Sequence, residues 1–255
     1  MTSCIFVLYL ATSGTLSAGV STHLRGTLSP GSIAQTDADV LYAQRGDIAS
    51  ARRAAEIWAQ QLRNTPADFD AAWKLARARF WLGSHANENE RKAFLESGIA
   101  AGRAAAGSRP NRPEGHFWTA ANMGALAESF GLRQGLKYRG TIREELMTVL
   151  RLDPAFQQGS ADRALGRWYL KVPGMFGGSK KQSEEHLRTS LTYNQNSISS
   201  RFFLAETLLE MDRKTEALAE LQRVGGLQPD PEWVPEDQEF KQKAQRLLAT
   251  LLQRR

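Results

Sequence analysis

The sequence has one cysteine, Cys4, and only four histidines among its 255 residues. A single cysteine excludes an internal disulfide framework. No stretch approaches the roughly 20 consecutive apolar residues that a membrane-spanning helix requires. The chain is 42% hydrophobic and 24% charged, which is ordinary for a globular protein with a sizeable core. These features exclude a multispan membrane protein, a collagen-like chain and a fully disordered chain.

Basic residues are in slight excess, but they do not form a cluster. The 33 Lys and Arg residues stand against 27 Asp and Glu residues, and most of the Arg residues are spread among acidic residues along predicted helices. Nucleic-acid binding usually needs a basic stripe or patch, so this pattern does not favour a nucleic-acid partner. The net charge of +6 fits a small anionic ligand better than a polyanion.

The usual catalytic and metal-binding patterns are missing from the sequence. The four histidines lie in separate segments, and none has a second His or Cys at metal-ligand spacing. A Gly-x-Ser-x-Gly motif is also missing, and Cys4 lies in a segment that resembles a signal peptide. We therefore predict a protein that is not an enzyme and uses neither a metal ion nor a cofactor.

Residues 1–18 combine an apolar stretch with small residues and predict a signal peptide cleaved after Ala18, although no positive charge follows Met1. The alternatives are a buried first helix or a disordered tail. Residues 19–35 are rich in Gly, Ser and Thr and predict a linker. We expect a periplasmic or secreted protein, with a cytoplasmic location as the alternative. Cys4 precedes the apolar stretch, whereas a lipid-anchored cysteine follows it, so we expect no lipid anchor.

The remainder, residues 36–255, is predicted to be helical. Its apolar residues recur at spacings of three and four, and Gly, Pro and Asp interrupt the pattern at intervals. This punctuation predicts about ten helices that form pairs, followed by one last helix over residues 236–254. Phe240 and Ala244 lie on the apolar side of this last helix, together with Leu247, Leu248 and Leu251.

The clearest repeat spans residues 198–229. It places a large and then a small residue on the first helix, Leu204 and Ala205, and Ala217 four residues before Leu221 on the second. These spacings are typical of a tetratricopeptide repeat, in which small residues let the two helices approach closely.

Four fainter units precede this repeat, which makes five helix pairs. One pair cannot bury its apolar face alone, so the pairs stack. We predict an all-α fold, a right-handed and elongated α-solenoid of about five degenerate tetratricopeptide-like pairs, with the last helix as a C-terminal cap.

The loop over residues 174–181 contains glycines and two lysines, which suit a bound anion. A phosphate-binding loop would place Lys before Ser or Thr, but here Ser179 precedes Lys180. We therefore predict a long turn in which Ser179 caps the next helix while Met175 and Phe176 pack inward.

A binding surface is the function that the repeats favour. The first helix of each pair lines the concave side of such a solenoid, and its exposed stripe mixes apolar side chains with two Arg residues. This lining fits an apolar ligand with an acidic head, or a peptide, and for each residue the alternative is inter-repeat core. The stripe is predicted to contain Lys74, Ala78, Trp81, His116, Thr119, Met123, Arg163, Arg167, Leu170, Phe202, Glu206 and Leu209.

Two segments carry more than a general repeat pattern. Residues 115–124 read GHFWTAANMG, and residues 164–169 read ALGRWY and lead to Pro173 and a Gly-Gly pair. They resemble the TatT proteins, the periplasmic T component associated with some TRAP transporters, and the specific resemblance covers residues 70–196. The matched positions are Trp118, Asn122, Gly124, Leu165, Gly166, Tyr169, Pro173, Gly177 and Gly178.

The resemblance implies an all-helical protein with a hydrophobic cleft or pore. Such a protein forms an oligomer, associates with a periplasmic substrate-binding protein of a TRAP transporter and passes an apolar organic acid to it. Most of the matched positions are interpreted as structural, and Asn122 is added to the candidate binding residues. The alternative function is a general tetratricopeptide adaptor that binds peptides or proteins.

Overall fold

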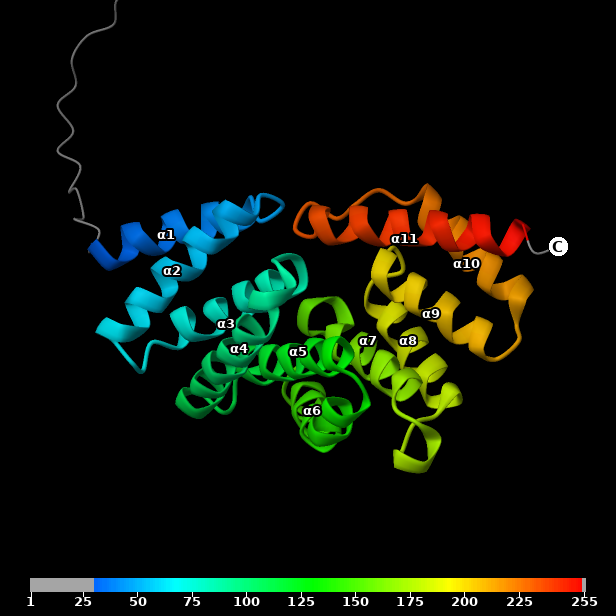
Figure 1. Ribbon diagram of the computed structural model, residues 1–255, viewed down its shortest axis with the longest axis horizontal. Helices are drawn as coiled ribbons and strands as arrows, with labels where there is room; N and C mark the ends of the chain where they lie inside the picture. The colour runs from blue at the N-terminus through cyan, green and yellow to red at the C-terminus, as the bar shows by residue number, and fades with distance from the viewer. Residues whose placement is uncertain (1–29, 254–255) are drawn as a thin grey trace, which may run out of the picture.

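The computed structural model describes residues 30–253, which form eleven α-helices and one short 3-10 turn, η1 (Gly174–Phe176). Five consecutive pairs, from α1–α2 to α9–α10, follow an arc, and α11 comes last (Figure 1). The all-α solenoid is therefore confirmed. The helices are α1 (Pro30–Ala43), α2 (Ile48–Asn64), α3 (Phe69–His85), α4 (Glu88–Ser108), α5 (Pro113–Phe130), α6 (Leu132–Leu152), α7 (Phe156–Lys171), α8 (Lys180–Tyr193), α9 (Ile198–Glu210), α10 (Lys214–Gly226) and α11 (Val234–Gln253).

The first helix begins inside the segment predicted as a linker. Helix α1 starts at Pro30, so it takes in the last residues of the stretch 19–35. The predicted signal peptide, residues 1–18, lies outside the described residues. Within the described residues, no helix combines the length and the apolar character that a bilayer crossing requires.

The fifth pair, α9 and α10, packs as its repeat pattern predicts. Leu204, Ala205 and Ala217 are fully buried, and Leu221 is only 1% exposed. The two alanines leave room for the helices to approach, while the leucines fill the space between them. The apolar side of α11, which includes Ala244, packs against the same core, so α11 covers the last pair as predicted.

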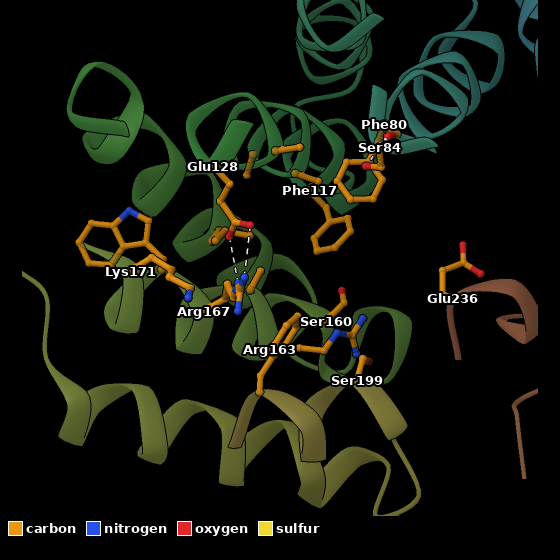
Figure 2. Close-up of a pocket in the computed structure, with 18 of the residues that line it drawn as sticks. Phe80, Ser84, Phe117, Glu128, Ser160, Arg163, Arg167, Lys171, Ser199 and Glu236 are labelled. Atoms are coloured by element: carbon orange, nitrogen blue, oxygen red, sulfur yellow. Dashed lines mark hydrogen bonds and ion pairs between the residues drawn. The ribbon is translucent and has the colours of Figure 1, made fainter. Parts of the chain in front are cut away.

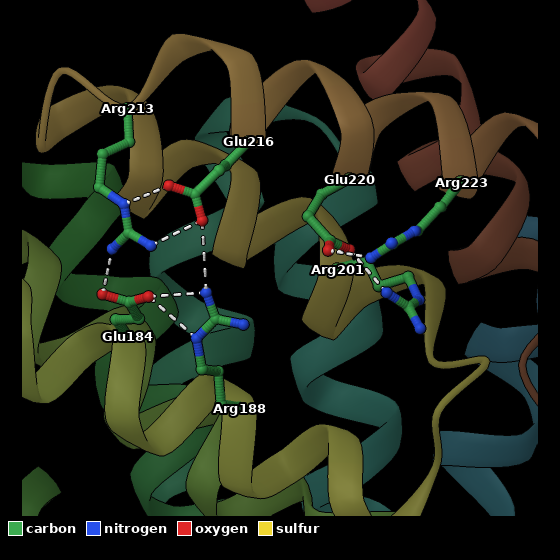
Figure 3. A network of polar contacts seen from close by, with 7 residues as sticks. All are labelled: Glu184, Arg188, Arg201, Arg213, Glu216, Glu220 and Arg223. Atoms are coloured by element: carbon green, nitrogen blue, oxygen red, sulfur yellow. Dashed lines mark hydrogen bonds and ion pairs between the residues drawn. The ribbon is translucent and has the colours of Figure 1, made fainter.

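Arginines stabilise the outer side of the last two pairs through ion pairs between helices (Figure 3). Arg201 occupies the position where the repeat usually has Trp, and its guanidinium lies 2.6 Å from Glu220 on α10. Arg213 pairs at 2.6 Å both with Glu184 on α8 and with Glu216 on its own helix. Some of the basic residues that are in slight excess in the sequence thus connect neighbouring helices through ion pairs.

Helices α4 and α5 approach each other closely at two glycines. A Cβ atom on Gly98 would overlap the side chain of Asn122, and one on Gly102 would lie 2.5 Å from the hydroxyl oxygen of Thr119. Such separations are too short for any side chain, so only glycine fits at these positions. The two glycines therefore allow α4 to pack closely against α5, the first helix of the next repeat.

The turn between α7 and α8 differs in part from its prediction. Ser179 caps α8 by accepting a hydrogen bond from the N–H of Gln182, as expected. Met175 is 85% exposed and Phe176 is 37% exposed, so the prediction that they pack inward is wrong. Backbone bonds to Pro173 and Tyr169 close the turn without them, which leaves both side chains pointing outward.

Candidate ligand-binding cleft

The concave side of the arc holds a cleft of about 1030 Å³. It lies between α3, α5, α6 and α7 on one side and α9 and α11 on the other, and its size suits a ligand as large as a drug molecule or a medium-chain organic acid. Figure 2 shows part of the lining, with side chains that reach inward from several helices. The apolar lining includes Tyr42, Phe80, Phe117, Trp118, Leu136, Ile142, Leu146, Trp168, Val172, Phe202, Phe203, Trp233 and Phe240.

Aromatic rings form one apolar wall of the cleft. The ring of Phe240 on α11 lies 5.5 Å from Phe202 and 5.1 Å from Phe203, both on α9. Opposite them, Trp118 on α5 lies 5.7 Å from Phe80 and 5.1 Å from Phe117. Large rings that are fixed by one another present apolar area at little entropic cost, so these walls favour an apolar ligand.

Helix α7 brings a row of cations to the cleft. Arg163, Arg167 and Lys171 are spaced by four residues, which places them on one face of the helix, and all three line the cleft (Figure 2). The guanidinium of Arg167 lies 2.9 Å from Glu128 and 2.5 Å from Glu206. Arg167 is thus neutralised by two carboxylates, whose charges hold its pKa above the usual range despite burial.

Arg163 lies one helical turn before Arg167 and has a different environment. Burial lowers the pKa of Arg163 to about 10, and the charge of Asp237 on α11 offsets this effect only in part. The group therefore stays positive at neutral pH. Burial also raises the pKa of Asp237, whose carboxylate accepts the N–H of Asp230 at 2.9 Å.

The start of α7 is strained where it borders the cleft. Gln157 and Gln158 have φ angles of 43° and 59°, in the left-handed region that costs a non-glycine residue roughly 1–2 kcal/mol. The side chain of Gln158 donates a hydrogen bond at 3.2 Å to Asp230, which in turn borders α11. A polar, strained group of residues therefore sits at the same end of the cleft as Arg163.

Helix α11 crosses the cleft and joins the two ends of the arc. Arg45, in the turn after α1, is 4% exposed and donates hydrogen bonds to Glu236 at 2.8 and 2.6 Å and to the carbonyl oxygen of Glu232 at 2.7 Å. The Arg45 guanidinium also lies 5.6 Å from the ring of Trp81 and 5.8 Å from that of Trp233. The elongated solenoid expected from the repeats is therefore closed into a ring (Figure 1).

A second contact of α11 is pH-dependent. Nε2 of His85 lies 2.5 Å from Glu239, and Nδ1 lies 2.8 Å from the carbonyl oxygen of Trp81. Burial lowers the pKa of His85, but these hydrogen bonds to acceptors outweigh burial and raise it above 6.5. Both ring nitrogens face acceptors, which fits the doubly protonated imidazole.

We predict that this contact weakens in alkaline solution. A raised pKa in the folded state means that the stabilisation is fully present below the unfolded value of His85 and is lost as pH rises through the folded value. The loss should be about 1 kcal/mol at most, because the pair is partly exposed. Melting temperatures measured from pH 6 to 9 should fall more steeply for the wild type than for His85→Gln; parallel curves would contradict the assignment.

The family model of the TRAP transporter T-component matches residues 114–255, which is more than half of the chain and takes in α5 to α11. The chain belongs to this family. The match confirms the resemblance noted in the sequence and extends it over the last repeat and α11. A second family model, regulator of microtubule dynamics protein 1-3, matches residues 35–181, which is also more than half of the chain and runs from α1 to the start of α8.

Solved repeat proteins share the fold of this T-component chain. TTC0263, a thermophilic TPR protein of Thermus thermophilus, is 20% identical with a TM-score of 0.63, over 87% of this chain and 98% of that one. A crystal structure of MamA is 11% identical with a TM-score of 0.51, over 84% and 98% of the two chains. At these identities the likeness concerns the fold alone. No curated protein matches the sequence.

Four of the residues predicted to bind a ligand meet at the cleft of this T-component. Arg163 and Arg167 come from α7, and Phe202 and Glu206 come from α9. They converge because α7 and α9 are first helices of neighbouring pairs, whose inner faces share the concave side. Their role in binding stays a prediction.

The other nine predicted residues, among them Ala78, Thr119, Leu170 and Leu209, do not line the cleft. Lys74 pairs with Asp39 on α1 at 2.6 Å, and the ring N–H of Trp81 donates to the carbonyl oxygen of Arg45 at 2.7 Å. Trp81 is 3% exposed and stacks on His85. The projection that placed Lys74 and Trp81 on an exposed concave stripe is therefore corrected, because both side chains contact the first repeat.

The four predicted residues on α5 likewise pack against neighbouring helices, and Thr119 is fully buried. His116 bonds to Glu145 on α6 at 2.5 Å, and Met123 is fully buried. The amide of Asn122 donates to the carbonyl oxygens of Ala76 at 3.0 Å and Trp118 at 2.7 Å. The prediction that these four residues face the concave side is therefore corrected, because this part of α5 is packed between α3, α4 and α6.

Several lining residues were not among the predicted ones. Phe240 was assigned to the apolar side of a terminal cap, and Phe117 lies one position from His116, on the face of α5 that actually meets the cleft. Trp233 directly precedes α11 and Asp237 lies in its first turn, and both come to the cleft only because this helix turns back. The only sequence feature that points to α11 as a cleft helix is that an apolar residue lies close to an acidic residue on it.

Proposed function

We propose that this protein is a non-enzymatic, periplasmic component of a TRAP-type solute uptake system that binds an apolar organic acid in the cleft. One observation carries the proposal. The concave cleft of this T-component is lined mainly by aromatic and aliphatic side chains, and a row of cations from α7 enters it. A cleft of this kind provides burial for an apolar tail and a positive charge for an acidic head.

The family supports the second part of the proposal, the partner. A T-component of a TRAP transporter associates with the transporter, and we propose that its partner is the periplasmic substrate-binding protein, with the T-component acting as an oligomer. A general adaptor for peptides is the rival function. It would need an open and mainly polar groove, whereas α11 crosses this cleft and adds Trp233 and Phe240 to its lining.

Mass spectrometry of organic extracts from the purified protein tests the ligand. We expect an organic acid with an apolar tail to co-purify, because burial of the tail in the cleft slows its release. Extracts of protein unfolded and refolded in detergent-free buffer provide the control. Repeated absence of any organic acid or lipid, together with binding of unrelated peptides, would favour the adaptor instead.

Size-exclusion chromatography tests the partner. The periplasmic substrate-binding protein of the TRAP transporter should co-elute with the purified chain as a complex. A mixture that elutes as two separate species at micromolar concentration would contradict the proposed association.

A further inference from the structure

Arg163 is a cation in the cleft whose charge is not neutralised by contact. Within the described residues, it makes no ion pair with a carboxylate, whereas Arg167 one turn away has Glu128 and Glu206 as partners. Arg167 therefore offers little net charge to a ligand, and Lys171 is exposed at the edge of α7. Of the three cations that α7 brings to the cleft, Arg163 is the one that is partly buried and has no carboxylate partner among the described residues.

Asp237 is the carboxylate whose charge acts on Arg163, and it already accepts a hydrogen bond from another residue. Asp237 influences Arg163 through its charge, but the two side chains are not within ion-pair distance. The carboxylate of Asp237 instead accepts the backbone N–H of Asp230, and burial, Asp230 and Glu236 all raise its pKa. Asp237 and Asp230 thus bring negative charge close to Arg163, but neither accepts a hydrogen bond from its guanidinium.

This arrangement costs stability in the unliganded protein. Arg163 is half-buried, so its guanidinium has lost part of its water without gaining a carboxylate partner, which is unfavourable for a charged group. The left-handed Gln157 and Gln158 add backbone strain at the same end of the cleft. Unpaired charge and strain that gather in one place indicate a site arranged for a ligand rather than for packing.

We propose that Arg163 binds the carboxylate of an apolar monocarboxylate, whose tail lies against Phe202, Phe203 and Phe240. The inference rests on the proposed function and narrows its ligand class. A guanidinium binds a carboxylate through two parallel hydrogen bonds, and the surrounding apolar walls strengthen them. Lys171, the other cation of α7 without an ion pair among the described residues, is exposed at the edge of the cleft, and Asp230, Asp237 and Glu206 repel a second anionic group. A dicarboxylate of equal length should therefore bind more weakly than the monocarboxylate.

Calorimetric titration with three probes of equal chain length tests the proposal. Decanoate has one carboxylate, 1-decanol has none and decanedioate has two. We expect the wild type to bind decanoate most tightly. Arg163→Met should weaken decanoate binding by about 10- to 100-fold, the worth of a charge-assisted hydrogen-bonded pair. Its affinity for 1-decanol should stay within about twofold, because the tail contacts remain.

Matched variants separate binding from folding. Arg163→Met should melt at the same or a higher temperature than the wild type, because methionine suits the apolar surroundings and carries no charge. Arg163→Lys keeps the charge and should retain part of the decanoate affinity. Asp237→Asn removes a repelling charge and should tighten decanoate binding several-fold. Arg53→Met, on the exposed outer side of α2, is the control that leaves binding unchanged.

Three results would overturn the assignment of Arg163 without touching the proposed function. One is wild-type affinity for decanoate in Arg163→Met, and a second is decanedioate that binds as tightly as decanoate. The third is a wild-type protein that binds 1-decanol but not decanoate. If the wild type binds none of the three probes, the proposed function itself fails and the role of Arg163 fails with it.

Discussion

Replacing Arg45 by alanine should lower the free energy of unfolding by about 3 kcal/mol, because removal of one partner leaves the other charge buried and unpaired. The guanidinium donates to Glu236 and Glu232 and lies 5.0 Å from the ring of Tyr42. Loss of Arg45 therefore removes both the ion pair and the ring contacts that join the first repeat to α11. We expect the start of α11 to detach from α1 and α3, which opens the cleft.

Urea unfolding followed by circular dichroism measures this effect. Arg53→Ala is the control, since Arg53 is exposed on α2 and should change stability by less than about 0.5 kcal/mol. A double-mutant cycle with Glu236→Gln isolates the ion pair, and the two changes should be strongly non-additive. If Arg45→Ala is as stable as Arg53→Ala, the closed ring does not contribute to stability and our account of α11 is wrong.

Replacing Gly178 by alanine should have an effect of similar size. A Cβ atom at this position would overlap the carbonyl group of Val172, which is backbone and cannot rotate away. The N–H of Gly178 donates to Pro173, and the next N–H, of Ser179, donates to Tyr169. A displaced Gly178 would disturb both bonds and the cap of α8, so we expect a loss of about 3 kcal/mol.

Gly174→Ala is the matched control for this turn. A Cβ atom on Gly174 would meet nothing within 4 Å, so this substitution should leave the melting temperature almost unchanged. The pair of variants places the same methyl group at two ends of one short turn. Equal melting temperatures for the two would show that the turn has room to move and would contradict the close approach of Gly178 to Val172.

The helix pairs are predictable because their signals are local. Leu204, Ala205, Ala217 and Leu221 are spaced within one repeat, and a spacing of three and four residues decides which side chains face one another. Pairing of consecutive helices then follows from the short connections between them. The ring closure is not predictable in this way. Arg45 and Glu236 are 191 residues apart in the sequence, and neither has a neighbour that marks it as a partner.

The residues of the candidate site were predicted correctly only on helices whose cleft-facing side was identified correctly from the sequence. On α7, Arg163 and Arg167 share a face that the pattern of buried residues defines clearly. On α5, most residues from Glu114 to Met123 are buried, because α3, α4 and α6 all pack against it, so Met123 and Asn122 could not be told from cleft residues. Trp81 was misplaced because the turn after α1 covers it. Tertiary packing, which the sequence pattern does not encode, decides these cases.

Photolabelling with a diazirine analogue of decanoate tests the central claim that the cleft binds an apolar carboxylate. Peptide mass spectrometry should place the label on α9 and α11, in the peptides that contain Phe202, Phe203 and Phe240, and excess decanoate should remove it. Arg163→Met should lose the label at the same probe concentration, whereas Arg53→Met should keep it. A label that resists decanoate, or one that falls on the outer helices α2 and α4, would contradict the account.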